Sequence, residues 1–427
     1  MLQKIDAVQQ FGGLSWPATR DEGLTRLARF LAQGGSAYAA QRDYDRGPAD
    51  RRNVSVLSAY IRHRLITEEE VVRQIVSLHG LRAAEKFVHE ICWRTYWKGW
   101  LEMRPAVWRR YGDDVVRLNA TLAENSDLRR RLERAEGGRT GLVCFDAWVE
   151  ELVTTGYLHN HARMWFASIW IYTLGLPWQL GARFFMQHLL DGDPASNTLS
   201  WRWMCGLHTA GKTYLARPEN IATYTGGRFP AQPRLAVTAP SAVEAVAVEK
   251  PIPLTPRPTV LTGPNVDGEV TLLVTEEDLH PESWPFGTAK VRSIILVTSS
   301  PSDHGLSERV QEFKASAMHD TGIRLARHFW CPAQSVDTAD TEAERIIMHA
   351  CAGSTALVMA EMPVGPVRTA VSPLITALGQ RGVHCVALRR PWDNALWPYA
   401  TSGFFKFKDA IPAALERFNI MQASQRS

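Results

Sequence analysis

The sequence lacks the features that would place it among membrane, secreted or zinc-binding proteins. No apolar run approaches the roughly 20 residues that a helix needs to cross a bilayer, and the first residues, MLQKIDAVQQFGG, lack the apolar core of a signal peptide. No C-x-x-C pair occurs among the six cysteines, which are Cys92, Cys144, Cys205, Cys331, Cys351 and Cys385. We therefore expect a reduced, cytoplasmic protein with no metal site, no disulfide framework and no membrane segment.

Basic residues are in excess only in the first half of the chain. Through residue 230 there are 30 Lys and Arg against 24 Asp and Glu, an excess of 6, whereas the rest has 18 against 20. The first half also holds 11 of the 15 tryptophans. These biases favour a phosphate-bearing partner and aromatic contacts there, although a solvated surface and a large helical core would also explain them.

Helical periodicity dominates residues 22–229. The stretch TEEEVVRQIVSLHG opens with a capping box of Thr67 and Glu70, spaces its apolar residues along one face, and reaches a stop signal at Gly80. The stretch FDAWVEELVTTG repeats the pattern and stops at Gly156. The sequence therefore predicts an all-helical first domain over residues 1–229.

The second half of the chain contains two kinds of sequence, a proline-rich stretch and then short apolar runs that alternate with helical stretches. Residues 230–264 hold eight of the 24 prolines with no sustained period, which is typical of a semi-rigid linker. From Glu269 on, the short apolar runs VTLLVT, SIILVT, TALVMA and VHCVAL alternate with helical stretches, and this predicts a parallel sheet with helices on both faces. Neither G-x-G-x-x-G nor a P-loop follows the first run. The predicted fold class is thus α+β, with a helical domain, a linker and a Rossmann-like α/β domain over residues 265–427.

One short segment, LLDGDPASNTLSWRW, combines carboxylates with tryptophans. It contains Asp191, Asp193, Asn197, Trp201 and Trp203 in the order D-G-D-x-x-x-N-x-x-x-W-x-W. A D-G-D turn capping a helix would explain the aspartates but not the tryptophans, and buried carboxylates need partners. This spacing resembles the flavin-binding domain of the photolyase/cryptochrome family.

Further segments resemble the same family in the same order. They are SAYAAQRDY, SVLSAYIRHRLIT, FVHEICWRTYW and GRTGLVCFDAWVEELVTTGYLHNHARM. The resemblance covers residues 22–229 and implies a helical domain that binds FAD.

The resemblance implies a set of FAD-binding positions. Hydroxyls and backbone N–H groups of a short loop can hold a diphosphate, and an arginine–carboxylate pair can lie beside the flavin ring. Taken singly, the serines would more often be helix caps and the arginines surface residues. The implied cofactor-binding residues are Tyr38, Ser55, Leu57, Ser58, Arg94, Arg163, Asp191, Asp193 and Asn197.

Three residues match positions of electron and proton transfer in the family. Asn197 corresponds to the residue opposite the reactive ring nitrogen of the flavin, and Trp201 and Trp178 to the first two members of a tryptophan chain. For a single tryptophan, core packing is the commoner explanation. Because residues 109–147 contain no tryptophan, Trp148 or Tyr111 is the candidate third member, unless the chain exits elsewhere.

Other residues match positions that hold a flipped pyrimidine dimer in the repair enzymes. Aromatic faces can support the bases and polar groups can read their edges. Asn160 stands where enzymes for the pyrimidine–pyrimidone photoproduct place a histidine, which favours the cyclobutane dimer as substrate. The implied substrate-binding residues are Arg42, Glu90, Trp93, Asn160, Met164 and Trp203.

The sequence departs from the family in three respects. His161 stands where arginine is usual, and Val54 replaces the first threonine of the phosphate loop. Only Cys92, Cys144 and Cys205 lie in the helical half, so we expect no iron–sulfur cluster. The α/β antenna domain normally comes first, whereas here DLHPES and RPWDNALWPYATSGFFKFKDAIP, which resemble its start and its closing stretch, follow the linker. This implies a swapped order like that of a circular permutation, and it leaves the second, antenna chromophore open.

Two functions follow from the resemblance. The first is a light-driven DNA photolyase that splits cyclobutane pyrimidine dimers by electron transfer from excited reduced FAD, with dimer-containing DNA as its partner. The alternative is a cryptochrome-like photoreceptor or signalling flavoprotein without repair activity. A structural module that has lost FAD is disfavoured because the flavin-facing positions are present together. Oligomeric state is left open.

Overall fold

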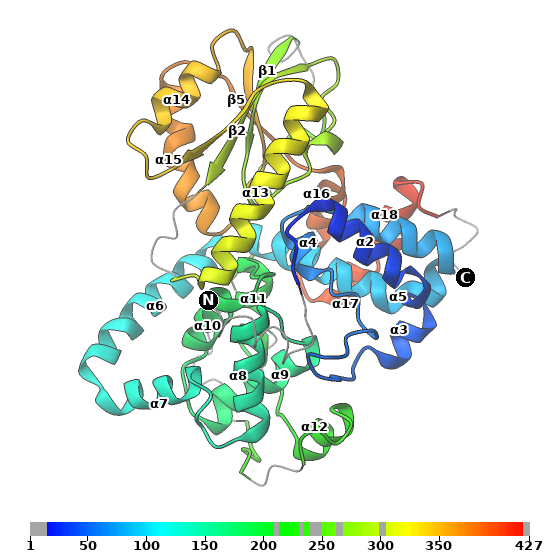
Figure 1. The fold of residues 1–427 in the computed structure, drawn as a ribbon, viewed down its shortest axis with the longest axis vertical. Helices are drawn as coiled ribbons and strands as arrows, with labels where there is room; N and C mark the ends of the chain where they lie inside the picture. Colours follow the sequence, from blue (N-terminus) through cyan, green and yellow to red (C-terminus); the bar gives the residue numbers. More distant parts are fainter. Residues whose placement is uncertain are drawn as a thin grey trace.

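The computed structural model describes residues 15–208, 213–230, 234–239, 249–261, 268–298 and 305–421. Its first part is built from helices and its later part contains one parallel sheet (Figure 1). The elements of the first part are α2 (Arg20–Phe30), η1 (Leu31–Gln33), α3 (Ser36–Gln41), α4 (Ser58–Arg62), α5 (Glu68–Glu102), α6 (Pro105–Glu124), α7 (Ser126–Glu136), α8 (Val143–Thr155), α9 (Asn160–Ser168), η2 (Ile169–Thr173), α10 (Trp178–His188), α11 (Pro194–Met204) and α12 (Pro218–Tyr224).

Helix α5 is the longest helix that the structure describes. It begins with the predicted capping box, in which the Thr67 hydroxyl accepts from the Glu70 N–H and the Glu70 carboxylate accepts from the Thr67 N–H. The predicted stop at Gly80 is confirmed, because α5 consists of two helical segments that meet at a kink there. Gly80 breaks the helical backbone with φ 71° and ψ 158°, and this positive φ is one that glycine tolerates. The predicted stop at Gly156 is confirmed as a left-handed cap with φ 71°.

The later part of the chain contains a five-stranded parallel sheet with the order β3-β2-β1-β4-β5. The predicted parallel sheet is confirmed. Strand β3 was not predicted, because its sequence AQSVD is polar and mostly accessible at the sheet edge. The elements are β1 (Glu269–Val274), η3 (Pro281–Ser283), β2 (Lys290–Thr298), α13 (Glu308–Phe329), β3 (Ala333–Asp337), α14 (Ala343–Ala350), β4 (Ala356–Ala360), α15 (Pro366–Gln380) and β5 (Cys385–Leu388).

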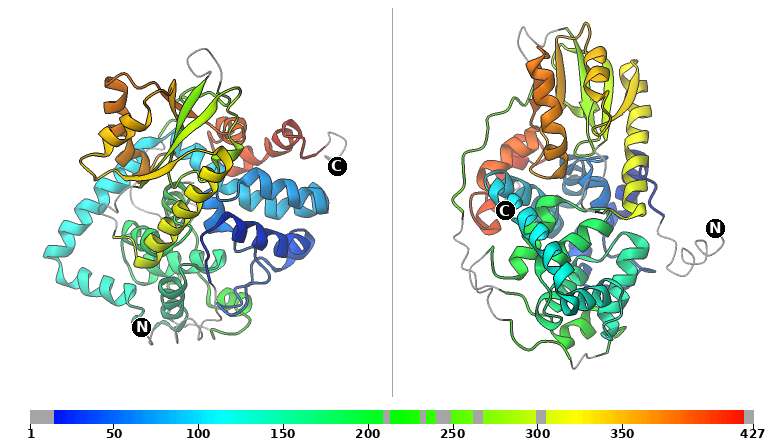
Figure 2. Two further views of the ribbon diagram at one scale, coloured as in Figure 1. Left: turned by 45° about the horizontal axis from the view of Figure 1, so that its top comes forward. Right: turned by 90° about the vertical axis from the view of Figure 1, so that its left-hand side faces the viewer.

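Helices cover both faces of this sheet, as expected for parallel strands (Figure 2). Alternate side chains of the central strands point to opposite sides. Leu272 and Ile294 pack with α13, whereas Leu273 and Ile295 pack with α14 and α15. The face on α13 belongs to the same apolar cluster as much of the helical half.

The closing helices return to the helical half. They are α16 (Pro391–Leu396), η4 (Trp397–Tyr399), α17 (Phe404–Lys408) and α18 (Ile411–Arg417), and they lie beside α5 (Figure 1). Trp392 donates from Nε1 to Thr95 Oγ1 at 3.0 Å, and the Tyr96 hydroxyl donates to the Ser402 carbonyl at 2.7 Å. Residues 391–417 thus pack on a helix that precedes the linker, and the domain boundaries at 1–229, 230–264 and 265–427 stay a prediction.

The described parts of the predicted linker form backbone hydrogen bonds with both halves of the chain. The Ile252 N–H donates to the Met103 carbonyl at 2.9 Å, and the Leu261 N–H donates to the Pro285 carbonyl at 2.9 Å. Residues 231–233, 240–248 and 262–264 of the predicted linker lie outside the described residues. In the part of the chain that is described, no helix has both the length and the apolar character needed to span a membrane.

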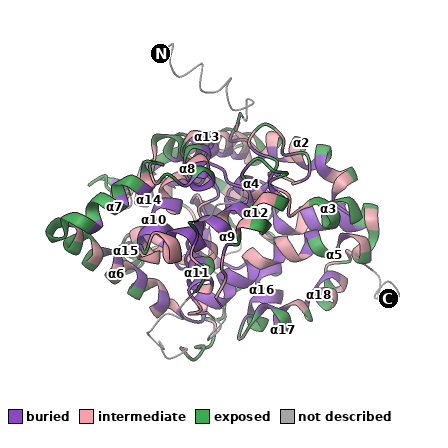
Figure 3. Cartoon of the chain, turned by 90° about the horizontal axis from the view of Figure 1, so that it is seen from below, coloured by how far each residue is buried: buried purple, intermediate pink, exposed green. Residues whose placement is uncertain are grey.

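The two halves meet at buried helices. About half of the residues of α5 and of α16 are buried, whereas α7 is mostly exposed (Figure 3). The ends of strands β1 and β4 meet α4 and α5: the Leu279 N–H donates to the His63 carbonyl at 2.9 Å, and Arg368 forms two bonds of 2.8 Å with Glu102. The sheet is therefore docked by its strand ends onto the helices that carry the site.

Candidate flavin site

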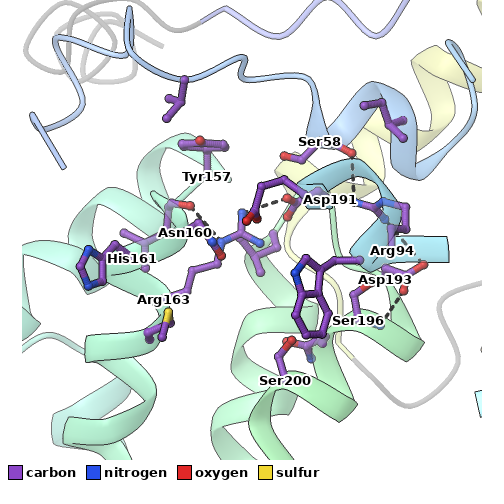
Figure 4. Close-up of a pocket in the computed structure, with 18 of the residues that line it drawn as sticks. Ser58, Arg94, Tyr157, Asn160, His161, Arg163, Asp191, Asp193, Ser196 and Ser200 are labelled. Carbon is purple, nitrogen blue, oxygen red and sulfur yellow. Dashed lines mark hydrogen bonds and ion pairs between the residues drawn. The ribbon is translucent and has the colours of Figure 1, made fainter. Parts of the chain in front are cut away.

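A cavity of about 460 Å³ lies among α3, α4, α5, α9 and α11. Every predicted site residue except Trp178 lines it. Figure 4 shows the polar side chains of its wall. The predicted residues brought together are Tyr38, Arg42, Ser55, Leu57, Ser58, Glu90, Trp93, Arg94, Asn160, Arg163, Met164, Asp191, Asp193, Asn197, Trp201 and Trp203.

The loop before α4 has an unusual backbone. Val56, between Ser55 and Leu57, has φ 54°, a conformation that β-branched residues rarely adopt. Leu57, the next residue, is right-handed with φ −96°. Successive residues of opposite hand can turn their N–H groups to one side, which makes a concave site for an anion. The loop therefore suits the phosphate-binding role predicted from its sequence.

Arg163 and Asp191 form a pair across the cavity wall (Figure 4). Arg163 Nη2 donates to Asp191 Oδ2 at 2.9 Å, and its Nε donates to the Leu158 carbonyl at 2.9 Å. Burial alone would raise the pKa of Asp191, but Arg163 holds it below its usual value. The pair is thus ionised and its geometry is held by the chain before α9.

Asp193 caps α11 and concentrates charge at the cavity floor. Its Oδ1 accepts from the Ser196 N–H at 2.7 Å. Its Oδ2 lies 3.6 Å from Lys98 Nζ and 3.7 Å from Arg94 Nη1. Burial would raise its pKa, but the surrounding cations outweigh this effect and keep the pKa well below the usual range.

Several buried polar atoms of this wall have no hydrogen-bond partner among the described residues. They are Arg94 Nη1, Asp191 Oδ1, Asp193 Oδ2 and Ser196 Oγ. Buried polar groups without a partner are rare in proteins. Both donors and acceptors are included, so a polar ligand with groups of both kinds fits the cavity.

Asn197 and Trp201 lie one turn apart on α11. Asn197 is held by a bond from its Nδ2 to the Ala182 carbonyl at 2.7 Å. Trp201 is buried, and its ring meets that of Trp170 edge to face at 6.2 Å. Both side chains also line the cavity.

Trp178 does not line the cavity. Its ring lies 5.7 Å from that of Tyr111, at 27°, and Tyr111 lies 5.3 Å from Trp108. Trp148 is elsewhere, where it stacks on Trp165 at 5.5 Å. Of the two candidate third members of the electron path, Tyr111 is therefore the one beside Trp178.

The predicted substrate residues form the cavity rim. Glu90 forms an ion pair with Arg42, and Asn160 is exposed at the start of α9. Trp93 has an unforeseen neighbour, since Phe404 of α17 stacks on it with ring centroids 3.8 Å apart and planes 10° apart.

Comparison with known proteins shows what the helical half is similar to. Residues 87–225 match the family described as the FAD binding domain of DNA photolyase. The deoxyribodipyrimidine photo-lyase of Streptomyces griseus is 32% identical over 195 residues, which are 44% of this chain and 40% of that protein. Its counterpart in Salmonella typhimurium is 28% identical over 212 residues, or 48% and 43%.

Solved structures of photolyases are also similar to about half of this chain. A bacterial class III photolyase from Agrobacterium tumefaciens has a TM-score of 0.41 and 24% identity, with 52% of this chain and 45% of that chain covered. An archaeal photolyase from Sulfolobus tokodaii has a TM-score of 0.39 and 26% identity, with coverage of 49% and 44%. The matches span less than half the length of these relatives.

Residues 87–225 are thus similar to the FAD binding domain of DNA photolyase. The cofactor of this photolyase-like domain is FAD. The cavity fits it, since the hydroxyls of Ser58 and Ser196 and one carboxylate oxygen of Asp191 lack a hydrogen-bond partner among the described residues and match a ligand that carries both donors and acceptors. In the photolyase-like site, the loop at residues 55–58 would hold the diphosphate, and Arg163, Asp191 and Asp193 would face the flavin.

One departure from the photolyase pattern, His161, has a local explanation. His161 Nδ1 bonds to the Asp43 carbonyl at 2.9 Å, and its ring stacks on Trp165 at 4.0 Å. Burial lowers the pKa of His161, so it is a neutral packing residue rather than a substitute for an arginine charge. His159 caps α9 by accepting from the His161 N–H at 3.2 Å.

Sequence reasoning missed residues that complete the photolyase-like site. Lys98 follows Arg94 by four residues on α5, so helical spacing alone would have placed both cations on one face. Tyr157 and Ser196 line the cavity from segments already recognised. No local signal pointed to Phe404, which lies more than 300 residues from Trp93 in the sequence.

Proposed function

We propose that this chain is a light-dependent DNA repair enzyme that splits cyclobutane pyrimidine dimers. One observation carries the proposal: two indoles, Trp93 and Trp203, line the same cavity as the flavin-facing carboxylates of Asp191 and Asp193. The alignment with proteins named deoxyribodipyrimidine photo-lyase supports it.

The rim has the chemistry needed for an extruded dimer. A base stacked on an aromatic side chain gains roughly 1–3 kcal/mol, and Trp93 and Trp203 supply such faces. Glu90, held by Arg42, and Asn160 supply acceptors and donors for the base edges. When bound, reduced FAD supplies the light-absorbing electron donor.

A second candidate function is that of a cryptochrome-like photoreceptor that binds FAD and repairs nothing. One observation favours it: Phe404 already stacks on one face of Trp93. If the dimer needed that face, α17 would have to move before the lesion could bind.

We also propose that the α/β half corresponds to the family's antenna domain in swapped order. The resemblance of DLHPES to the start of that domain supports this, because the segment begins four residues after the end of β1, the central strand of the sheet. A circular permutant that starts within the linker 230–264, with its native ends joined by a flexible Gly/Ser segment, should fold and bind FAD. A permutant that is insoluble while the parent is folded would contradict this proposal.

The decisive experiment for function is illumination of the FAD-reduced protein with a dimer-containing oligonucleotide, followed by chromatography of the bases. Repair predicts loss of the dimer in light and none in darkness. No loss in light, from a preparation that holds reduced FAD, would reject repair and favour the photoreceptor.

A further inference from the structure

A buried charge network connects the cavity floor with the α/β half. Glu277 lies three residues beyond the end of β1, and its carboxylate accepts two bonds from Arg62, at 2.9 and 2.8 Å. Arg62 Nε in turn donates to the Gly192 carbonyl at 2.9 Å and lies 3.8 Å from Asp193 Oδ2. Arg62 therefore contacts a carboxylate of each half.

A second cation is shared in the same way. Lys98 Nζ lies 3.6 Å from Asp193 Oδ2 and 3.6 Å from Glu277 Oε2. The four side chains are between 1% and 4% exposed. Water and salt screen such buried charges weakly, so a change in the charge of Glu277 alters the electrostatic potential at Asp193.

The neighbouring carboxylate does not duplicate this role. Glu276 lies 3.9 Å from Arg62, but it pairs more closely with Lys314 of α13, at 2.8 Å. Glu277 is thus the carboxylate of the α/β half that holds both Arg62 and Lys98.

Glu277 lies just beyond the carboxyl end of β1, where ligands often bind in sheets of this kind. In doubly wound sheets, ligands bind beyond the carboxyl ends of the strands where the strand order reverses. Here that point lies between β1 and β4, and the segment after β1 directs buried carboxylates at the helical half instead.

We propose that Glu277 is a positioning residue of the FAD site, which acts through Arg62 and Lys98 on Asp193. With Glu277 ionised, each cation is divided between two carboxylates. With Glu277 neutral, Asp193 alone would balance the charges of Arg62 and Lys98. The electrostatic potential at the cavity floor beside Asp193 would then be more positive. Because reduced flavin carries more negative charge than oxidised flavin, the α/β half thereby lowers the reduction potential of bound FAD. The inference rests on FAD binding and not on repair.

The test is a spectroscopic redox titration of FAD in the full chain. Glu277→Gln keeps the shape of the side chain and removes its charge, so the midpoint potential should move to a more positive value. Glu277→Asp keeps the charge and should stay nearer the parent. Lys98→Met should move the potential in the opposite direction.

The matched control is Glu102→Gln. Glu102 is another carboxylate at the contact between the halves, but it bonds to Arg368, whereas Glu277 is paired with Arg62 and Lys98. Its loss should leave the potential unchanged. An unchanged potential in Glu277→Gln, or an equal shift in both variants, would overturn the proposal.

A double variant covers the case in which Glu277→Gln does not hold FAD. Lys98→Met with Glu277→Gln removes one charge of each sign, so the potential should lie near that of the parent. A double variant that is shifted as far as Lys98→Met alone would also overturn the proposal. Failure of repair with these shifts present would reject the proposed function and leave this inference intact.

Discussion

The ring of Phe404 lies flat against the ring of Trp93, 3.8 Å away and tilted by only 10°. Trp93 lines the candidate flavin cavity, whereas Phe404 is nearly buried and comes from the last part of the chain. Two rings at this distance and tilt overlap almost face to face, so Phe404 covers one face of the Trp93 indole. The closing helices thus support the rim residue on which the proposed dimer would rest.

Trp93→Ala should weaken binding of dimer-containing duplex by about one to two powers of ten, because about 1.4 kcal/mol is tenfold and stacking is worth roughly 1–3 kcal/mol per base. Binding of undamaged duplex should change less and should fall with added salt, since it rests on phosphate contacts. A titration of parent and variant with both duplexes at fixed salt measures this. Equal affinity of the parent for the two duplexes would end the repair hypothesis.

Asp191→Ala should weaken FAD binding by roughly tenfold or more, because it leaves Arg163 without its carboxylate, a loss of about 1–3 kcal/mol. The parent should be yellow, with about one noncovalent FAD per chain. Glu269→Ala is the control, since it removes an exposed ion pair between Glu269 at the start of β1 and Arg292 of β2. Fluorescence titration with FAD measures both variants, and a folded parent that takes up no FAD would reject the flavin site.

Trp201→Phe should remove most of the rate of light-driven FAD reduction while FAD stays bound, because Trp201 lines the cavity and lies beside Trp170. Tyr111→Phe should slow the reaction if electrons leave through Trp178, which it contacts. Trp148→Phe should have no effect, because Trp148 packs on Trp165 instead. Absorbance during illumination follows the reaction, and an unchanged rate in Trp201→Phe would mean another electron route.

Acidification should destabilise the contact between the halves through His63. Burial, together with the charge of Arg62, lowers the pKa of His63 from 6.5 to about 4, and its Nδ1 bonds to the Glu276 carbonyl at 2.9 Å. Since the folded pKa lies below the unfolded value, the stabilisation is present above pH 6.5 and is lost as pH falls toward 4. The loss at pH 5 is about 2 kcal/mol.

Urea unfolding of the parent at pH 7.5 and pH 5 measures this loss. His63→Gln keeps a donor for the Glu276 carbonyl but does not titrate, so its stability should fall less between the two pH values. An equal loss in parent and variant would show that other buried groups cause the acid sensitivity.

The sequence by itself determined the elements whose signals are local. The capping box of Thr67 and Glu70 is formed as predicted, because both partners lie within one helical turn. The alternation of apolar runs with helical stretches led to the parallel sheet, whereas polar β3 left no such pattern. Asp191, Asp193 and Asn197 lie on one wall because a short turn and one helix carry all three.

Only the tertiary structure decided what these local elements meet. Neither Glu277 beside Arg62 nor Phe404 on Trp93 follows from any spacing, because more than 200 residues separate the partners in the sequence. Their contacts depend on how the ends of β1 and β4 dock onto α4 and α5 and on the return of the closing helices to α5. Such docking is set by the fit of whole surfaces and by buried charges that must find partners. The residues of the cavity wall could therefore be predicted from the sequence. The residues that surround and support them depend on the tertiary packing.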